Sequence, residues 1–136
     1  MIDCESKHFI FSQNALFTSD MSKMLSCLFR GKKYIIPNQV QYINDYAFFL
    51  CQSLTQISIP SSVIYIGKKA FSWCKSLQNL IIPQSVSIID DYAFEKCQSL
   101  SQITIPNTIE QIGNKAFNGC KALNKIIVPK GSKEKN

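Results

Sequence analysis

The six cysteines are the residues of this sequence most capable of chemistry, because a thiol can form a disulfide, bind a metal or act as a nucleophile. Four of them follow one another at steps of 23 residues: Cys51, Cys74, Cys97 and Cys120. A constant step predicts a column of inward-facing side chains, in which free cysteine serves as a small buried hydrophobe. The Cα atoms of neighbouring cysteines in such a column would lie about 5 Å apart, which is within the range for a disulfide. Their side chains would run parallel, however, and this argues against a bond between them. Zinc is disfavoured, because the sequence contains no CxxC pair.

The other polar candidates give no catalytic constellation. Cys4 and Cys27 lie outside the 23-residue series and either form a bridge within the N-terminal segment or stay free. For His8, the single histidine, the sequence pattern identifies no catalytic partner, so we expect it to be exposed or packed in that segment. Asp90 and Asp91 are adjacent and predict a solvated turn. With no glycine-rich phosphate loop and no HExxH, we predict no enzyme, no metal site and no cofactor.

A 23-residue repeat organises the chain and therefore decides where these side chains lie. Three further markers keep the same step: the prolines Pro37, Pro60, Pro83, Pro106 and Pro129, the Ala-Phe pairs at 47, 70, 93 and 116, and the leucines Leu54, Leu77, Leu100 and Leu123. A unit of this size cannot bury its own apolar face, but stacked copies can. The repeat therefore predicts a solenoid.

Each unit begins with a short strand. Ile57 and Ile59 are two residues apart, which predicts that they face the core while Gln56 and Ser58 face outward. Pro60 then ends the strand, because proline cannot donate to a ladder. In "GKKAFSWC" the apolar residues at 70, 71 and 74 fit one face of a helix, so we predict one or two helical turns. The predicted fold is a right-handed α/β solenoid with a short parallel sheet on one face and short helices or turns on the other.

The segment before the repeats is different. "FIFSQNALFTSDMSKMLSCLFRGKKYIIP" alternates apolar stretches with turn-like ones, which predicts a hairpin or short meander that caps the first strand. We therefore divide a single domain into a cap (1–34), a repeat array of about four units (35–129) and a basic tail (130–136). The last strand, 126–128, has no comparable cap and is either protected by the short tail or available for pairing.

The unit "CxxLxxIxIPxxVxxIxxxAFxxC" resembles the BspA-like (treponemal-type) leucine-rich repeat, and the resemblance covers residues 35 to 128. The ending "VPKGSKEKN" is also similar to the way such arrays finish, without the aromatic residue that often follows. This resemblance implies a surface or secreted adhesion protein of a bacterium or parasitic protist that contacts host matrix or other cells. The sequence itself sets no location.

The net charge of +6 does not indicate a nucleic-acid partner. The cap and the tail each carry +2, and the four units that begin at Pro37, Pro60, Pro83 and Pro106 carry −1, +3, −2 and +2. A phosphate-binding surface needs one sign along a continuous stripe. No apolar run reaches the roughly 18 residues of a membrane span, and the acidic start does not fit a signal peptide, so we expect a soluble chain.

The strand side chains that point away from the core are the predicted ligand-binding residues, here called the strand face. They are Lys33, Ile35, Gln56, Ser58, Asn79, Ile81, Gln102, Thr104, Lys125 and Ile127. This mixture of amides and isolated isoleucines suits protein contact and suits catalysis poorly. Trp73 stands where other units have Leu50, Lys96 and Gly119, so it is either a surface anchor or a side chain that lies over the predicted helix of the neighbouring unit.

The sequence therefore predicts a non-catalytic protein-binding module that acts through the strand face. Two alternatives stay open: an intracellular leucine-rich repeat scaffold, and a structural array that self-associates through its C-terminal edge.

Overall fold

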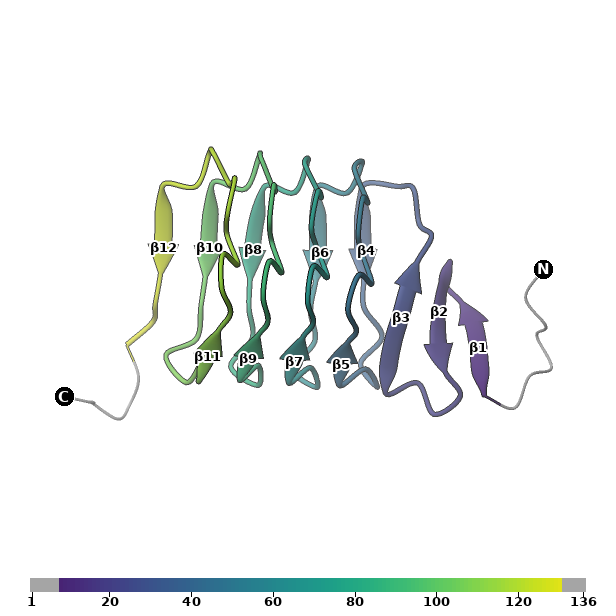
Figure 1. Ribbon diagram of the computed structural model, residues 1–136. Coiled ribbons are helices and arrows are strands. Elements are labelled where there is room, and N and C mark those ends of the chain that lie inside the picture. The colour runs from purple at the N-terminus through teal and green to yellow at the C-terminus, as the bar shows by residue number, and fades with distance from the viewer. Residues whose placement is uncertain (1–7, 131–136) are drawn as a thin grey trace.

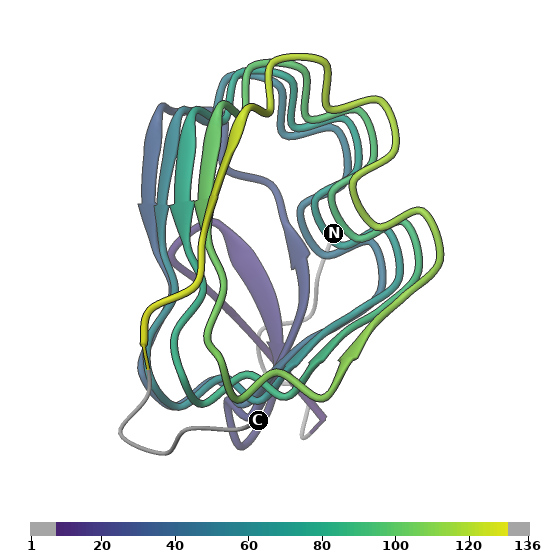
Figure 2. The same cartoon turned by 90° about the vertical axis from the view of Figure 1, so that its left-hand side faces the viewer.

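The computed structural model describes residues 8–130, which wind into a solenoid of stacked coils (Figure 1). Viewed along the axis, the coils superpose closely (Figure 2). Successive coils repeat about every 23 residues, as the sequence predicts. The right-handed sense of the winding stays a prediction.

Three antiparallel strands form the N-terminal cap. They are β1 (Phe9–Ser12), β2 (Ala15–Thr18) and β3 (Lys23–Cys27). β1 pairs with β2 and β2 with β3, and β3 then pairs in parallel with the first coil. Ala15, Phe17 and Met24 are buried, so the meander covers the first coil with apolar side chains, as expected of a solenoid cap.

One long side of the solenoid is built from three-residue strands, one in each coil. They are β4 (Lys33–Ile35), β6 (Gln56–Ser58), β8 (Asn79–Ile81), β10 (Gln102–Thr104) and β12 (Lys125–Ile127). β4 pairs in parallel with β6, and β10 pairs in parallel with both β8 and β12. The alternation predicted for these strands is confirmed in β4 and β8, where the central Tyr34 and Leu80 are buried between exposed neighbours. It fails in β12, where Ile126 is exposed and Ile127 is half-buried, because no further coil covers Ile126 in the described part of the chain.

A second row of parallel strands was not predicted. β5 (Tyr42–Ile43), β7 (Tyr65–Ile66), β9 (Ile88–Ile89) and β11 (Gln111–Ile112) continue the cap into a seven-stranded sheet. Each strand has only two residues, which is too short for an alternating pattern to be recognised in the sequence. The two rows of strands lie on different sides of every coil (Figures 1 and 2).

The predicted short helices are wrong, because residues 8–130 contain strands and turns but no helix. In the turn 68–73, Lys69 and Trp73 have φ angles of 55° and 64°, so left-handed residues interrupt any helical run. The backbone N–H of Phe71 donates to Ala93 of the next coil, and that of Trp73 donates to Glu95. Hydrogen bonds between coils therefore replace the helical ladder.

The core is a set of columns that run along the solenoid axis. The rings of Phe48, Phe71, Phe94 and Phe117 stack with centroids 4.8, 5.1 and 5.5 Å apart and nearly parallel planes. The first three of these rings are fully buried, whereas Phe117 in the last coil is only partly buried. At the same end Ile112, Ile126 and Val128 are exposed, so the last coil presents apolar side chains to solvent.

Candidate protein-binding surface

The strand face brings its ten predicted residues into two rows across the strands. Register pairs Lys33 with Gln56, and Gln102 with both Asn79 and Lys125, which forms a row of amides with a lysine at each end. The second row follows in the same way and alternates apolar with hydroxyl side chains: Ile35, Ser58, Ile81, Thr104 and Ile127. Between β6 and β8, the N–H of Gln78 donates to the carbonyl of Thr55.

Two isoleucines of this face are largely exposed to solvent. Ile35 is 73% exposed and Ile81 is 70% exposed. Gln102, Thr104 and Ile127 are half-buried, so the N-terminal half of the strand face is the more accessible. Large apolar side chains on an otherwise polar surface are typical of contact points for a partner.

Two open grooves lie on this half of the strand face. One of about 370 Å³ is lined by Gln56, Ser58, Asn79 and Ile81, together with residues 57, 59 and 83. Another of about 560 Å³ is lined by Ile35 and Ser58 with Gln13 and residues 36–38 and 60. Ser58 lies on both grooves, so five of the predicted residues line one hollowed surface. The contribution of Gln13 was missed, since the cap gives no repeat from which its position could be read.

The column cysteines are hydrogen-bond donors to neighbouring coils. Cys74 donates from Sγ to the carbonyl of Phe48 at 3.1 Å, and Cys97 and Cys120 donate in the same way to Phe71 and Phe94. Burial raises the pKa of the Cys74 thiol to about 12. At neutral pH this thiol is protonated and keeps its donor, so it joins coils and is a poor nucleophile.

Cys27 was predicted to lie outside the cysteine column, but it lies beside Cys51 at the start of that column. It is buried and forms no disulfide within residues 8–130, and its carbonyl accepts from Cys51 Sγ at 3.8 Å. The step from Cys27 to Cys51 is 24 residues, which hid its place in the series. The hydrogen bond between these two thiols is the main cause that raises the pKa of Cys51, and burial is the second cause. The same hydrogen bond lowers the pKa of Cys27. Cys4 lies outside the described residues, and the bridge predicted as one possibility stays a prediction.

The adjacent carboxylates act within the fold. Asp90 Oδ2 accepts from the hydroxyl of Tyr65 at 2.7 Å, and Asp91 Oδ1 accepts from the backbone N–H of Asn114 at 2.8 Å. They are half-buried and tie successive coils together, which goes beyond the solvated turn that the sequence predicted. His8 is exposed beside the ring of Phe9. Within 8–130, no three His, Cys, Asp or Glu side chains cluster in a way that could hold a metal ion.

Trp73 lies on the opposite side of each coil from the strand face. It is half-buried, and Lys96 of the next coil places its ammonium 5.8 Å from the centre of the Trp73 ring system. Trp73 does not line either groove of the strand face.

Stacked coils of 23 residues with a parallel strand in each define a leucine-rich repeat solenoid. The chain belongs to the family described as the BspA type leucine rich repeat region, which matches residues 8–135 in six copies. No helix in the described part of the chain is long and apolar enough to cross a membrane. No curated protein matches the sequence.

Solved bacterial structures share the fold. The pneumococcal vaccine antigen PcpA superposes with a TM-score of 0.86 at 20% identity over 90% of this chain and 31% of that one. A leucine rich cell surface protein from Faecalibacterium prausnitzii gives 0.71 at 24% identity over 94% and 41%. A leucine-rich repeat protein from Bacteroides capillosus gives 0.80 at 24% identity over 90% and 99%. The chain therefore spans about a third of PcpA and under half of the Faecalibacterium protein.

Proposed function

We propose that this chain is a non-catalytic protein-binding module whose ligand lies across the strand face. The observation that carries the proposal is the pair of grooves that share Ser58 and are flanked by the exposed Ile35 and Ile81. Amides in the neighbouring row can donate and accept, so they adapt to backbone and side-chain groups of a protein ligand. The isoleucines supply apolar anchor points.

The setting that we propose is a microbial surface or secreted protein that contacts host matrix or other cells. Its support is that one similar structure is described as a cell surface protein and another as a vaccine antigen. An intracellular scaffold would use the same strand face, and the buried free thiols are equally compatible with it. Localisation of the full protein by surface labelling of intact cells separates the two settings.

A pull-down with a charge-altered variant tests the strand face. The variant carries Gln56→Glu, Asn79→Asp and Gln102→Glu, each close in size to the original side chain. A matched control carries Gln41→Glu, Gln111→Glu and Asn118→Asp. These substitutions change the net charge by the same amount, at exposed amides outside the strand face. The proposal predicts that the control retains the partners of the unaltered chain and that the strand-face variant loses them. Retention by both variants would exclude this face.

Self-association is a second candidate, favoured by the exposed apolar end of the last coil. Ile112, Ile126 and Val128 are solvent-exposed there, and β12 pairs with only one strand. A second copy could cover this end and extend the ladder. Light scattering over a range of concentrations tests the idea. We expect a mass that rises with concentration and returns to the monomer value in Ile126→Lys, and a constant monomer mass would refute self-association.

A further inference from the structure

A second apolar surface lies on the turns, remote from the strand face. The turn segments 45–50, 68–73, 91–96 and 114–119 stack along the solenoid and form what we call the turn face (Figure 2). In its first segment Tyr46 and Leu50 are 49% and 47% exposed, and Phe49 between them is also exposed. The rings of Tyr46 and Phe49 are in contact, with centroids 5.3 Å apart. Three large apolar side chains are therefore presented to solvent by one turn.

Trp73 extends this patch onto the second coil. Its position is equivalent to that of Leu50, since the two residues are 23 apart. The backbone N–H of Leu50 donates to Ser72 at 3.0 Å, which holds the two turns one beside the other. Tyr46, Phe49, Leu50 and Trp73 thus form one apolar patch across two coils.

The backbone at these positions is unfavourable for the residues that occupy them. Leu50 and Trp73 both have a φ of 64°, in the left-handed region that costs an ordinary residue roughly 1–2 kcal/mol. The equivalent positions in the third and last coils are Lys96 and Gly119, with φ angles of 63° and 79°. Glycine adopts this conformation without steric cost. Positive φ at this position is therefore a property of the turn in every coil, and the fold itself selects neither a leucine nor a tryptophan for it.

The repeat does not require apolar side chains on the turn face either. At the positions of Tyr46, Phe49 and Leu50, the last coil has Lys115, Asn118 and Gly119, and the same turn forms. The patch is therefore specific to the first two coils.

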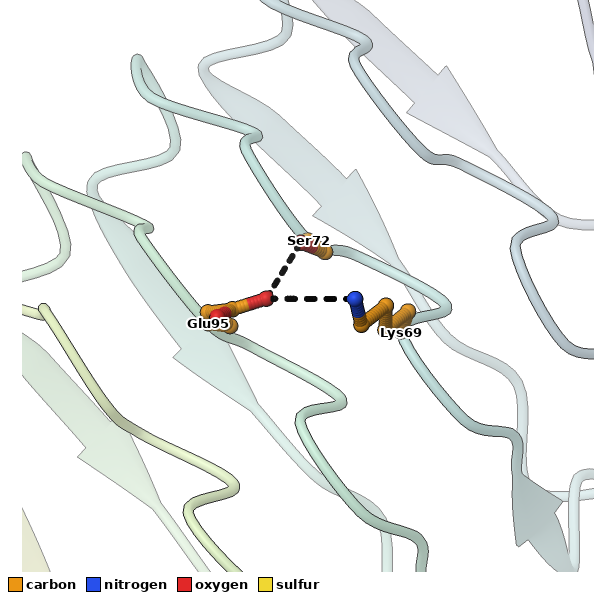
Figure 3. A network of polar contacts seen from close by, with 3 residues as sticks. All are labelled: Lys69, Ser72 and Glu95. Carbon is orange, nitrogen blue, oxygen red and sulfur yellow. Dashed lines mark hydrogen bonds and ion pairs between the residues drawn. The ribbon is translucent and has the colours of Figure 1, made fainter.

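Lysines border the patch, and the acidic side chains beside it make contacts within the fold: Asp45, exposed next to Tyr46, accepts at Oδ1 from the backbone N–H of Lys68 at 2.8 Å. Glu95 is already engaged, because its Oε1 accepts from the Ser72 hydroxyl at 3.1 Å and lies 4.0 Å from Lys69 Nζ (Figure 3). Lys96 lies over Trp73 and has no carboxylate partner within residues 8–130. Lys68 and Lys75 on the second coil are exposed. An apolar patch bordered by such lysines complements a ligand that carries both apolar and acidic side chains.

We propose that the turn face of the first two coils is a second binding site, which takes an acidic segment of a partner protein with large apolar side chains. The apolar side chains of the partner's segment pack on Leu50, Phe49 and Trp73, and one of its carboxylates pairs with Lys96. Because Lys96 already lies against the indole, an incoming carboxylate meets a partly desolvated ammonium, where an ion pair is stronger than in bulk water.

A peptide selection tests this site without knowledge of the natural partner. A displayed library of random-sequence peptides is selected on the full chain, and enriched peptides are then synthesised and titrated. We expect them to combine aromatic or aliphatic residues with Asp or Glu. Their affinity should fall at least tenfold in Leu50→Asn/Trp73→Asn and in Lys96→Glu, and should be unchanged in the strand-face variant Ile81→Ser.

Thermal unfolding of the same variants separates binding from folding. Asparagine tolerates positive φ, so Leu50→Asn/Trp73→Asn should have a Tm equal to or above that of the unaltered chain. Lys96→Glu provides a second variant if the double variant unfolds early. Peptides that bind all variants equally, or a library that yields no acidic apolar peptide, would overturn the proposal. A dimer that dissociates in the double variant would assign the patch to a second copy instead and would also overturn it.

Discussion

Replacing Phe71 by alanine tests whether the stacked phenylalanines hold the coils together. Phe71 is fully buried and stacks on both sides, at 4.8 Å from Phe48 and 5.1 Å from Phe94. Burial of a phenylalanine contributes about 1.5–3 kcal/mol, and each aromatic pair adds about 0.5–1.5 kcal/mol. Since alanine leaves a cavity between two rigid neighbours, we expect the free energy of unfolding to fall by about 3–5 kcal/mol.

Phe117→Ala is the matched control, because this ring stacks on one side only and is partly exposed. Its loss should cost about half as much, roughly 1–2 kcal/mol, since one pair and part of the burial are lost. Urea denaturation is followed by far-UV circular dichroism and by the fluorescence of Trp73, the single tryptophan. Coincident transitions license the two-state treatment, which a repeat protein does not always obey. Equal costs for the two variants would refute the column as the source of this stability.

Three further predictions concern contacts between coils. The Ser62 hydroxyl donates to the Val40 carbonyl at 2.7 Å, whereas the buried hydroxyl of Ser85, at the equivalent position, has no partner within the described residues. Ser62→Ala should therefore lower the free energy of unfolding, measured by urea denaturation, by about 1 kcal/mol, and Ser85→Ala should leave it unchanged. The reverse order would contradict the hydrogen-bond assignment. Because burial raises the pKa of Cys74 from 9.0 to about 12, the stability that its neutral thiol contributes is complete below pH 9 and is lost as pH rises from 9 to 12. Cys74→Ala should flatten that fall, and an unchanged slope would exclude this thiol. Gly67→Ala should lower the free energy of unfolding by about 1–3 kcal/mol, because the new Cβ would lie 2.6 Å from the backbone nitrogen of Asp45. An unchanged free energy of unfolding would show that the two coils can separate there.

The repeat made the strand side of this fold predictable. Alternation around Ile57, followed by Pro60, indicated a strand with one buried side, and a fixed step placed the same strand in each coil. The predicted strand face therefore needed only the periodicity and the register that a constant step imposes.

The turn side was not predictable in the same way. Ala70, Phe71 and Cys74 have helical spacing, but the chain adopts positive φ at Lys69 and Trp73, and neither residue type indicates that conformation. Only Gly119, in the last coil, signals it. Whether side chains meet between coils, as Lys96 and Trp73 do, depends on stacking geometry that one unit cannot reveal.

Hydroxyl-radical footprinting of the chain bound to a captured partner tests the central claim most directly. The extent of oxidation is compared among residues of one type, isoleucine. Ile35 and Ile81 report on the strand face, and Ile64, which is exposed beside β7, is the reference. If the partner binds through the strand face, it should lower the oxidation of Ile35 and Ile81 severalfold and leave that of Ile64 unchanged. Protection of Ile64 with Ile35 and Ile81 still fully oxidised would contradict binding through the strand face.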